Sequence, residues 1–499
     1  MDLCTLLARV RARGQTALAH RVGIDMRALA VFRISLGLVL LSDLLLRSRD
    51  LVAFYTDSGV LPRSILREQF PNFSQLSIHT LSGAAWFQGL MFVVAGIFAV
   101  LVLVGYRTRF ATAISLVLLV SLHARNPVLL NAGDSLLRRL LLWGVFLPLG
   151  GRLSVDALHD DKRQNRVVSL ASAGLLLQVV VIYTVNALFK LRGDLWVRGV
   201  AVQYVFSLDH LTVFLGDFFA RFPALLELFD TIWLMLVASS VLLLLLTGWS
   251  RAVFASLFIG MHLGMLLTMR LGPFPLVSIT ALIPFLPGIV WDSTMGVADQ
   301  VTDDFDTARI RGRVDMLPAF RPFEIPRQIT QLTARTVPIV LAGLIVFVLV
   351  WNAATLGYVE TPPEVKSAVD PGEHRWSMFA PEPRTTDGWY VVPGRLESGK
   401  RTDAFHQRTI RWRQPPDVAQ GFPSHRWLVY LLDLQRDGYE GLRPSFAEHV
   451  CNRWNSNHED ELTELSVYYV EQPTRLHGPE PTNRIELVQY SCISGDTIE

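Results

Sequence analysis

Residues Val167 to Phe189 read VVSLASAGLLLQVVVIYTVNALF and contain no charged side chain. A helix rises about 1.5 Å per residue, so this stretch is long enough to cross the roughly 30 Å hydrocarbon core of a bilayer. Such a run is typical of a transmembrane helix. It therefore decides the fold class that we predict for the chain.

The composition of the whole chain agrees with a membrane protein. Of 499 residues, 51% are hydrophobic and only 18% are charged, which argues against a series of ordinary soluble domains. The 46 Lys and Arg residues nearly balance the 44 Asp and Glu residues, so we expect no nucleic-acid partner. The three cysteines form no CxxC motif and no Cys/His cluster, and we predict no metal site.

Eight further apolar stretches lie along the chain. Together they predict a polytopic α-helical membrane bundle of about nine transmembrane helices, surrounded by the lipid bilayer. The nine predicted spans are Ala28–Leu46, Ala85–Val104, Phe110–Leu122, Leu136–Gly150, Val167–Phe189, Thr231–Gly248, Ala252–Met269, Phe274–Trp291 and Val337–Ala354.

Basic residues predict the orientation, because Lys and Arg are enriched in short cytoplasmic loops. Most of them fall on the side of the basic N-terminus, although the first loop also carries several. We therefore expect a cytoplasmic N-terminus and an extracytoplasmic C-terminus. The predicted parts are a cytoplasmic basic amphipathic segment (1–27), the transmembrane bundle (28–295), a cytoplasmic basic linker (296–336), a final transmembrane helix (337–356) and an extracytoplasmic soluble domain (357–499).

The last part has the pattern of a mixed α/β, strand-rich domain. Strands are predicted at Trp389–Leu396, Leu462–Glu471 and Arg484–Cys492, and one or two helices within His425–Trp454. Cys451 and Cys492 are the only cysteines on this side of the membrane, so we predict a disulfide between them.

The most informative polar residues follow the apolar run Val167–Phe189. Tyr183, Asn186 and Lys190 are spaced i, i+3, i+7 and fall on one face of a helix. A desolvated lysine can act as a general base, which makes Lys190 a candidate catalytic residue. We place Tyr183, Asn186, Asp194 and Trp196 in a binding site beside it. The alternative is a lysine that snorkels to the membrane surface, with Trp196 as an aromatic anchor.

Other ionisable residues lie within the predicted spans, where each is a functional candidate. His262 is central in its span, so a role in proton handling or substrate binding competes with simple packing. Opposite charges can pair along helices, and structural ion pairs are the favoured interpretation of Arg33, Asp43, Asp134 and Arg138.

Several motifs resemble the horizontally transferred transmembrane (HTTM) family, which includes the vitamin K-dependent γ-glutamyl carboxylases. The similarity covers roughly the first 300 residues. It is carried by Phe32–Gly37, Phe54–Arg63, Phe146–Gly150, Leu153–Asp156, Tyr183–Gly199, His262 and Leu271–Pro275.

The resemblance implies roles for two of these residues. Lys190 matches the carboxylase lysine that is the presumed base for the reduced vitamin, and His262 matches a carboxylase histidine. A further family histidine has no counterpart, since the region reads NAGDS from Asn131 to Ser135. This departure argues against glutamate carboxylation as the reaction.

The resemblance therefore implies a quinol-dependent oxidative modifying enzyme of the bacterial inner membrane, related to the carboxylases. Its cofactor would be a reduced quinone of the vitamin K or menaquinol type. Trp376–Pro383 and Asp387–Trp389 resemble the outer domain of bacterial HTTM proteins, which either recognises an exported protein or peptide or serves as a structural cap. The alternative function is a non-enzymatic membrane factor that assists maturation of an exported protein or lipid.

Overall fold

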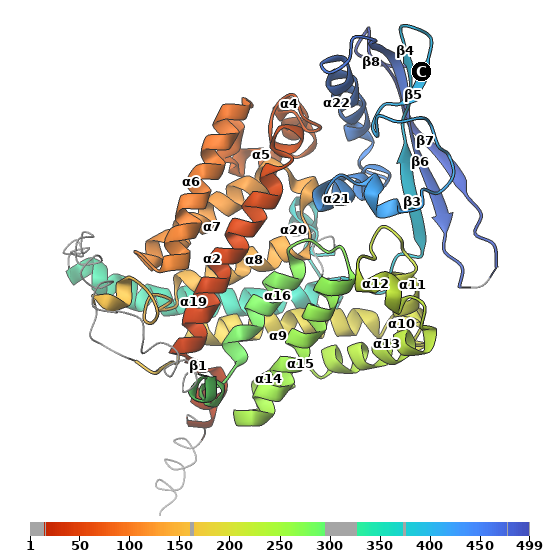
Figure 1. Ribbon diagram of the computed structural model, residues 1–499. Coiled ribbons are helices and arrows are strands. Elements are labelled where there is room, and N and C mark those ends of the chain that lie inside the picture. Colours follow the sequence, from red (N-terminus) through yellow and green to blue (C-terminus); the bar gives the residue numbers. More distant parts are fainter. Residues whose placement is uncertain are drawn as a thin grey trace, which may run out of the picture.

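The computed structural model combines a large helical part with a smaller C-terminal domain built on a sheet (Figure 1). It describes residues 14, 16–159, 164–294, 327–372, 376–476 and 478–498, without the side chains of 327–330, 367 and 368. Most of the predicted basic linker, residues 296–326, and the first 13 residues of the predicted basic segment lie outside the described residues.

The helical part begins with a two-residue strand, β1 (Ile24–Asp25), which pairs antiparallel with β2 (Arg166–Val167). Its long helices are α2 (Met26–Ser48), α6 (Ala85–Val104), α7 (Thr108–Arg125), α8 (Ala132–Val145), α9 (Leu170–Lys190), α13 (Pro223–Ala238), α15 (Gly248–Thr268) and α19 (Arg327–Thr355). The shorter helices are α3 (Leu51–Tyr55), α4 (Arg63–Gln69), α5 (Pro71–Leu76), η1 (Ile78–Leu81), η2 (Pro127–Leu129), η3 (Asp156–Leu158), α10 (Asp194–Val197), α11 (Ala201–Phe206), α12 (Leu215–Phe219), α14 (Leu242–Leu245), α16 (Phe274–Leu282), η4 (Ile283–Phe285) and α20 (Pro363–Ala368).

The predicted count of nine membrane spans is not confirmed. Within the described part of the chain, five helices are long and apolar enough to cross a membrane, namely α2, α6, α9, α15 and α19. The bent pair Phe274–Phe285 and Gly288–Thr294 would make a sixth. The predicted span Thr231–Gly248 does not form one helix, because α13 ends at Ala238 and the chain turns before α14. The helix α8 is too short, with 14 residues.

Local sequence signals fix where several helices begin and end. Asp25 accepts a hydrogen bond from the Arg27 amide at the start of α2, and Ser169 forms a capping box at the start of α9. The helix α6 ends at Gly105, whose φ of 71° is a left-handed conformation that glycine adopts without strain. These caps satisfy backbone groups that lack partners at helix ends.

The C-terminal domain contains a six-stranded antiparallel sheet and two helices, α21 (His425–Leu434) and α22 (Arg443–Asn455). The strand order is β5-β4-β6-β7-β8, and β3 also pairs with β6. This architecture confirms a strand-rich C-terminal region. The remaining elements are β3 (Thr386–Val391), β4 (Pro393–Leu396), β5 (Arg401–Asp403), η5 (Val418–Gly421), η6 (Glu440–Leu442), β6 (Leu462–Pro473), β7 (Asn483–Ser491) and β8 (Asp496–Thr497).

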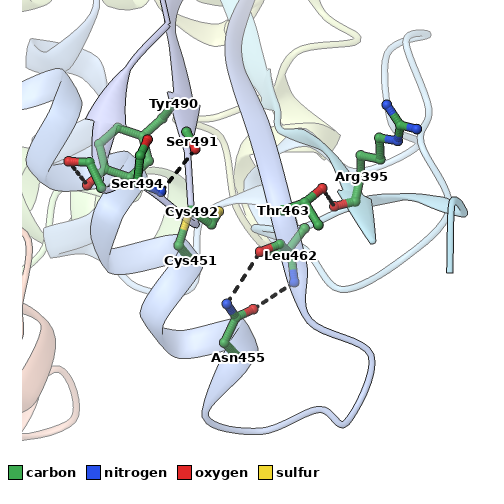
Figure 2. Close-up of a disulfide and its surroundings, with 10 residues drawn as sticks. Arg395, Cys451, Asn455, Leu462, Thr463, Tyr490, Ser491, Cys492 and Ser494 are labelled. Carbon is green, nitrogen blue, oxygen red and sulfur yellow. Dashed lines mark hydrogen bonds between the residues drawn. A yellow bond between two sulfur atoms is a disulfide. The ribbon is translucent and has the colours of Figure 1, made fainter. Parts of the chain in front are cut away.

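The predicted disulfide between Cys451 and Cys492 is confirmed. Figure 2 shows how it ties α22 to the residue that follows β7. Asn455, one turn further along α22, exchanges two hydrogen bonds with the backbone of Leu462 at the start of β6. The helix is thus fixed to two neighbouring strands of the sheet.

The sheet domain and the helical part share a hydrophobic core. Phe54 of α3 packs against Trp427 and Tyr430 of α21, with ring centroids 4.7 and 5.8 Å apart. The Trp427 indole also donates a hydrogen bond to Asp50. The C-terminal domain therefore packs directly against the helical part that contains the candidate site.

Candidate functional site

The predicted polar stripe of α9 exists and is buried. Tyr183, Asn186 and Lys190 all lie within the helix, and their exposed fractions are 7%, 4% and 0%. Their spacing places them on one face, as the periodicity of a helix requires. The stripe therefore faces the protein interior over two turns.

The Lys190 amine lies against two tryptophan rings. Its Nζ atom is 3.0 Å from the centroid of Trp196 on α10 and 4.7 Å from the centroid of Trp233 on α13. Among the described residues, Nζ has no hydrogen-bond partner. Since Lys190 is fully buried, its amine does not snorkel to the surface.

One carboxylate lies close enough to interact electrostatically with Lys190. This is Asp230 of α13, which is itself 0% exposed and accepts a hydrogen bond from the Val202 amide at 2.8 Å. Sequence reasoning missed both Asp230 and Trp233. A signal was present, because an acidic residue within the apolar stretch of α13 is a functional candidate at membrane depth.

His262 joins the other end of the stripe. The Tyr183 hydroxyl and the His262 Nε2 atom are 2.7 Å apart, and the imidazole packs against Phe274 with ring centroids 5.6 Å apart. Tyr183 precedes Lys190 by seven residues, so about 10 Å of helix separates them. His262 and Lys190 thus occupy opposite ends of the stripe.

Residues 376–383, which we call the strap, lie against this stripe and come from the start of the C-terminal region. The Asn186 side-chain amide donates to the carbonyl groups of Trp376 and Met378, at 3.2 and 3.0 Å. The Trp196 indole donates to the carbonyl of Phe379 at 2.7 Å. The motif Trp376–Pro383, which resembles the outer domain of bacterial HTTM proteins, therefore lines the site that contains Asn186 and Trp196.

Asp194 does not join the other predicted site residues. It lies on the first turn of α10 with its side chain exposed. The helix α10 contacts the strap through the next residue, Leu195. Its amide donates a hydrogen bond to the carboxylate of Glu382 at 3.3 Å.

The predicted structural ion pairs exist for two of the four residues, but their partners differ from the expected ones. Asp43 binds Arg47 at 2.7 Å, and Asp134 binds Arg47 at 2.6 Å. Arg426 of α21 binds both carboxylates, at 2.8 and 2.7 Å. This network of two arginines and two aspartates is buried where the C-terminal domain meets the helices.

The two other predicted partners lie outside that network. In the described chain Arg33 forms no ion pair, and it donates to the carbonyl of Leu153. Arg138 contacts His123, with Nη1 and Nδ1 2.6 Å apart. The i, i+4 pair that does form is Asp43 with Arg47, since Arg33 is ten residues away from Asp43.

Asp43, His123 and Asp134 form one group whose spacing is suitable for a metal ion, with possible ligand atoms all within 4.8 Å of one another. Both carboxylates, however, already bind the guanidinium groups of Arg47 and Arg426. The geometry therefore favours an ion-pair network at this position.

A pocket of about 350 Å³ opens between the strap, α21 and the turn before α16. His210 lines it and pairs with the buried Asp387 through Nδ1, at 2.6 Å, while its Nε2 atom has no partner among the described residues. His425 also lines the pocket, and burial, with a smaller effect of Arg426, lowers its pKa to about 3. Leu428 and Phe274 supply apolar walls. The pocket thus combines an apolar lining with two imidazole rings.

Apolar helices of membrane length, together with charged groups buried among them, define an integral membrane protein with a C-terminal sheet domain. The model of the HTTM domain matches residues 22–289, which is more than half of the chain. The chain belongs to the HTTM domain family, to which the γ-carboxylases are also related. No curated protein and no solved structure matches it significantly.

Proposed function

We propose that this HTTM protein is a quinol-dependent oxidative modifying enzyme in which Lys190 accepts a proton from a reduced quinone. The observation that supports this most strongly is a lysine amine that is fully buried and lacks a hydrogen-bond partner among the described residues. A buried amine held among rigid aromatic rings is a suitable proton acceptor when it is neutral.

In this proposal, the quinol O–H bond breaks and the proton moves to the lone pair of the Lys190 Nζ atom. The faces of Trp196 and Trp233 stabilise the resulting ammonium, and Asp230 adds an opposite charge nearby. A reduced quinone of the vitamin K or menaquinol type supplies two electrons and its second hydroxyl proton. Molecular oxygen accepts these together with the proton held by Lys190, which leaves a quinone and hydrogen peroxide.

The surface of α13 supports entry of the quinol from the bilayer. The helix presents Asp230 and Trp233 toward Lys190, while its other side chains include exposed apolar groups. These are Leu228, Phe229, Ile232 and Met235, with exposed fractions between 40% and 65%. A hydrophobic quinol would therefore meet an apolar surface next to the base.

We propose that His262 acts at the second end of the stripe. Its Nδ1 atom has no partner among the described residues, while Nε2 is held by the Tyr183 hydroxyl. A fixed imidazole with one unpaired nitrogen can exchange a hydrogen bond or a proton with a bound substrate.

We place the second substrate, an exported protein or peptide, in the 350 Å³ pocket beneath α21. Phe274 lies between the pocket and His262, because it lines the pocket and also packs against the His262 ring. A side chain bound there would contact Ser377, Met378 and Phe379 of the strap. This arrangement gives the C-terminal domain a role in substrate recognition.

The orientation that fits this proposal places the C-terminal domain outside the cytoplasm. Ser398 lies exposed in the sheet domain and is a suitable position for a reporter. A membrane-impermeant maleimide should label Ser398→Cys from outside intact spheroplasts, in a Cys4→Ser background. Labelling only after the membrane is permeabilised would reverse the proposed topology.

Quinol oxidation by the purified protein tests the proposed function. We expect nanodisc-reconstituted protein to consume oxygen and form quinone when a menaquinol-type quinol is added. Lys190→Ala should reduce the rate about 100-fold or more, the usual contribution of a general base. Arg192→Ala is the matched control, because Arg192 lies two residues further along the chain and is exposed.

The binding-factor alternative gives a different result in the same experiment. The aromatic contacts of Lys190 would then only hold the local fold. Wild type and Lys190→Ala would both lack quinol oxidation, and mass spectrometry of the purified protein would identify a bound lipid or peptide and no quinone.

A further inference from the structure

A second and larger pocket lies at the opposite end of the helical part. It has a volume of about 520 Å³ and lies between the start of α2, strand β2, the start of α15 and the turn after η4. In Figure 1 this is the end marked by β1 and α14, away from the sheet domain. It is therefore separate from the Lys190 site.

The lining of this pocket carries more positive than negative charge. Four arginines line it. Among the described residues, Arg27 forms ion pairs with Asp25 at 2.9 Å and with Asp292 at 2.7 Å. In the described part of the chain, no carboxylate forms an ion pair with the other three, which are Arg152, Arg166 and Arg251. Asp25 interacts electrostatically with Arg166, but four arginines against two aspartates still favour an anionic ligand.

Arg251 supplies the most specific signal. Its exposed fraction is 3%, and Nη1 donates to the carbonyl of Arg21 at 2.9 Å. The Nε and Nη2 atoms have no partner among the described residues, and the same is true of Nε of Arg152. Buried N–H donors are normally satisfied, so these unpaired donors indicate that an acceptor belongs in the pocket.

The electrostatic environment strengthens this conclusion. Arg251 lies close enough to Arg166 for the two like charges to repel each other. Two membrane-length helices, α2 and α15, also begin at this pocket, at Met26 and Gly248. Asp25 caps the start of α2, whereas the start of α15 has no side-chain cap. The partial positive charge at the N-terminal end of α15 therefore attracts anions.

Because α15 is long and apolar enough to cross a membrane, we expect its first residues, and the pocket beside them, at the level of the lipid headgroups. Trp249, next to the lining residue Gly248, is 54% exposed at the start of the membrane-length helix α15. Exposed tryptophans at helix ends are typical of the membrane–water interface. Basic pockets between helices at this level are known to bind anionic lipid headgroups.

We propose that this basic pocket binds a phosphate group, supplied either by an anionic phospholipid headgroup or by a soluble phosphate. Arg251 and Arg152 would donate their unpaired N–H groups to the phosphate oxygens, since guanidinium forks match that geometry. The proposal does not depend on the quinol chemistry described above.

Binding of a fluorescent phosphatidylglycerol to the full-length protein in detergent tests the proposal. We expect saturable binding that weakens about tenfold or more in Arg251→Gln and in Arg152→Gln, since each loses charge-assisted hydrogen bonds. Arg109→Gln is the control, because Arg109 is exposed on α7 and does not line the pocket. Arg152→Gln keeps the test informative if Arg251→Gln fails to fold.

Competition identifies the source of the phosphate. Displacement by unlabelled phosphatidylglycerol, but not by phosphatidylcholine or inorganic phosphate, assigns the pocket to an anionic lipid. Displacement by inorganic phosphate at similar concentration assigns it to a soluble phosphate. Failure of both to bind saturably, or equal binding by Arg251→Gln, Arg152→Gln and Arg109→Gln, would overturn the proposal.

Discussion

At the scale of single residues, the sequence predicts the stripe but not its surroundings. The spacing of Tyr183, Asn186 and Lys190 fixes a common helix face, because it depends only on local periodicity. The partners come from distant positions: Trp233 reaches Lys190 from another helix, and Trp376 accepts from Asn186 across 190 residues. No local rule predicts contacts at such separations.

The hydrogen bond between Tyr183 and His262 gives a prediction at this scale. Tyr183→Phe removes the hydroxyl and leaves the His262 Nε2 atom buried without its 2.7 Å partner. We expect a loss of about 1–3 kcal/mol in stability, measured by thermal or denaturant unfolding in detergent. Tyr358→Phe, at a position that is 67% exposed, should unfold like the wild type. Equal stability of all three proteins would show that the bond contributes nothing.

At the scale of elements, the sequence predicts helices and strands better than it predicts membrane spans. The predicted strand Leu462–Glu471 corresponds to β6, because alternating β-branched and aromatic residues suit a half-buried sheet. The predicted count of nine spans is not confirmed, because apolar composition does not reveal where a helix breaks. The segment Thr231–Gly248 contains no charged residue but turns at residues 239–241, where Ser239 and Ser240 lie.

The link between α22 and β7 gives a prediction at the scale of elements. The disulfide joins positions 41 residues apart, which corresponds to about 4 kcal/mol on the chain-entropy model. Replacing both Cys451 and Cys492 by serine should lower the unfolding temperature, and reduction of the wild type should have the same effect. Cys4→Ser should not change it. An unchanged unfolding temperature in the double variant would exclude a stabilising disulfide.

At the scale of the whole molecule, buried charges join the two parts. Arg426 comes from the C-terminal domain, while Asp43 and Asp134 come from α2 and α8. From the sequence we predict ion pairs for both aspartates, with Arg33 and Arg138 of the helical part as their partners. An arginine almost 300 residues away completes the network, and only the folded chain brings it there.

The junction gives a prediction at the scale of the whole molecule. Arg426→Met preserves much of the volume but leaves two buried carboxylates to share Arg47, which should destabilise the junction by about 3–5 kcal/mol. Limited proteolysis should then release the C-terminal domain, and unfolding should begin at lower temperature. Arg436→Met is the control, because the Arg436 side chain is 57% exposed and such a surface ion pair, here with Asp433, contributes about 0–1 kcal/mol. Equal resistance to protease in both variants would contradict this role of Arg426.

The most direct test of the central claim is quinol oxidation by Lys190→Arg, normalised to the amount of folded protein in nanodiscs. Arginine keeps a permanent cation that can stack on Trp196 and Trp233, but it cannot accept a proton at neutral pH. We predict a folded protein with a rate as low as that of Lys190→Ala. Full activity in Lys190→Arg would contradict the account, because the site would then need only a positive charge at this position.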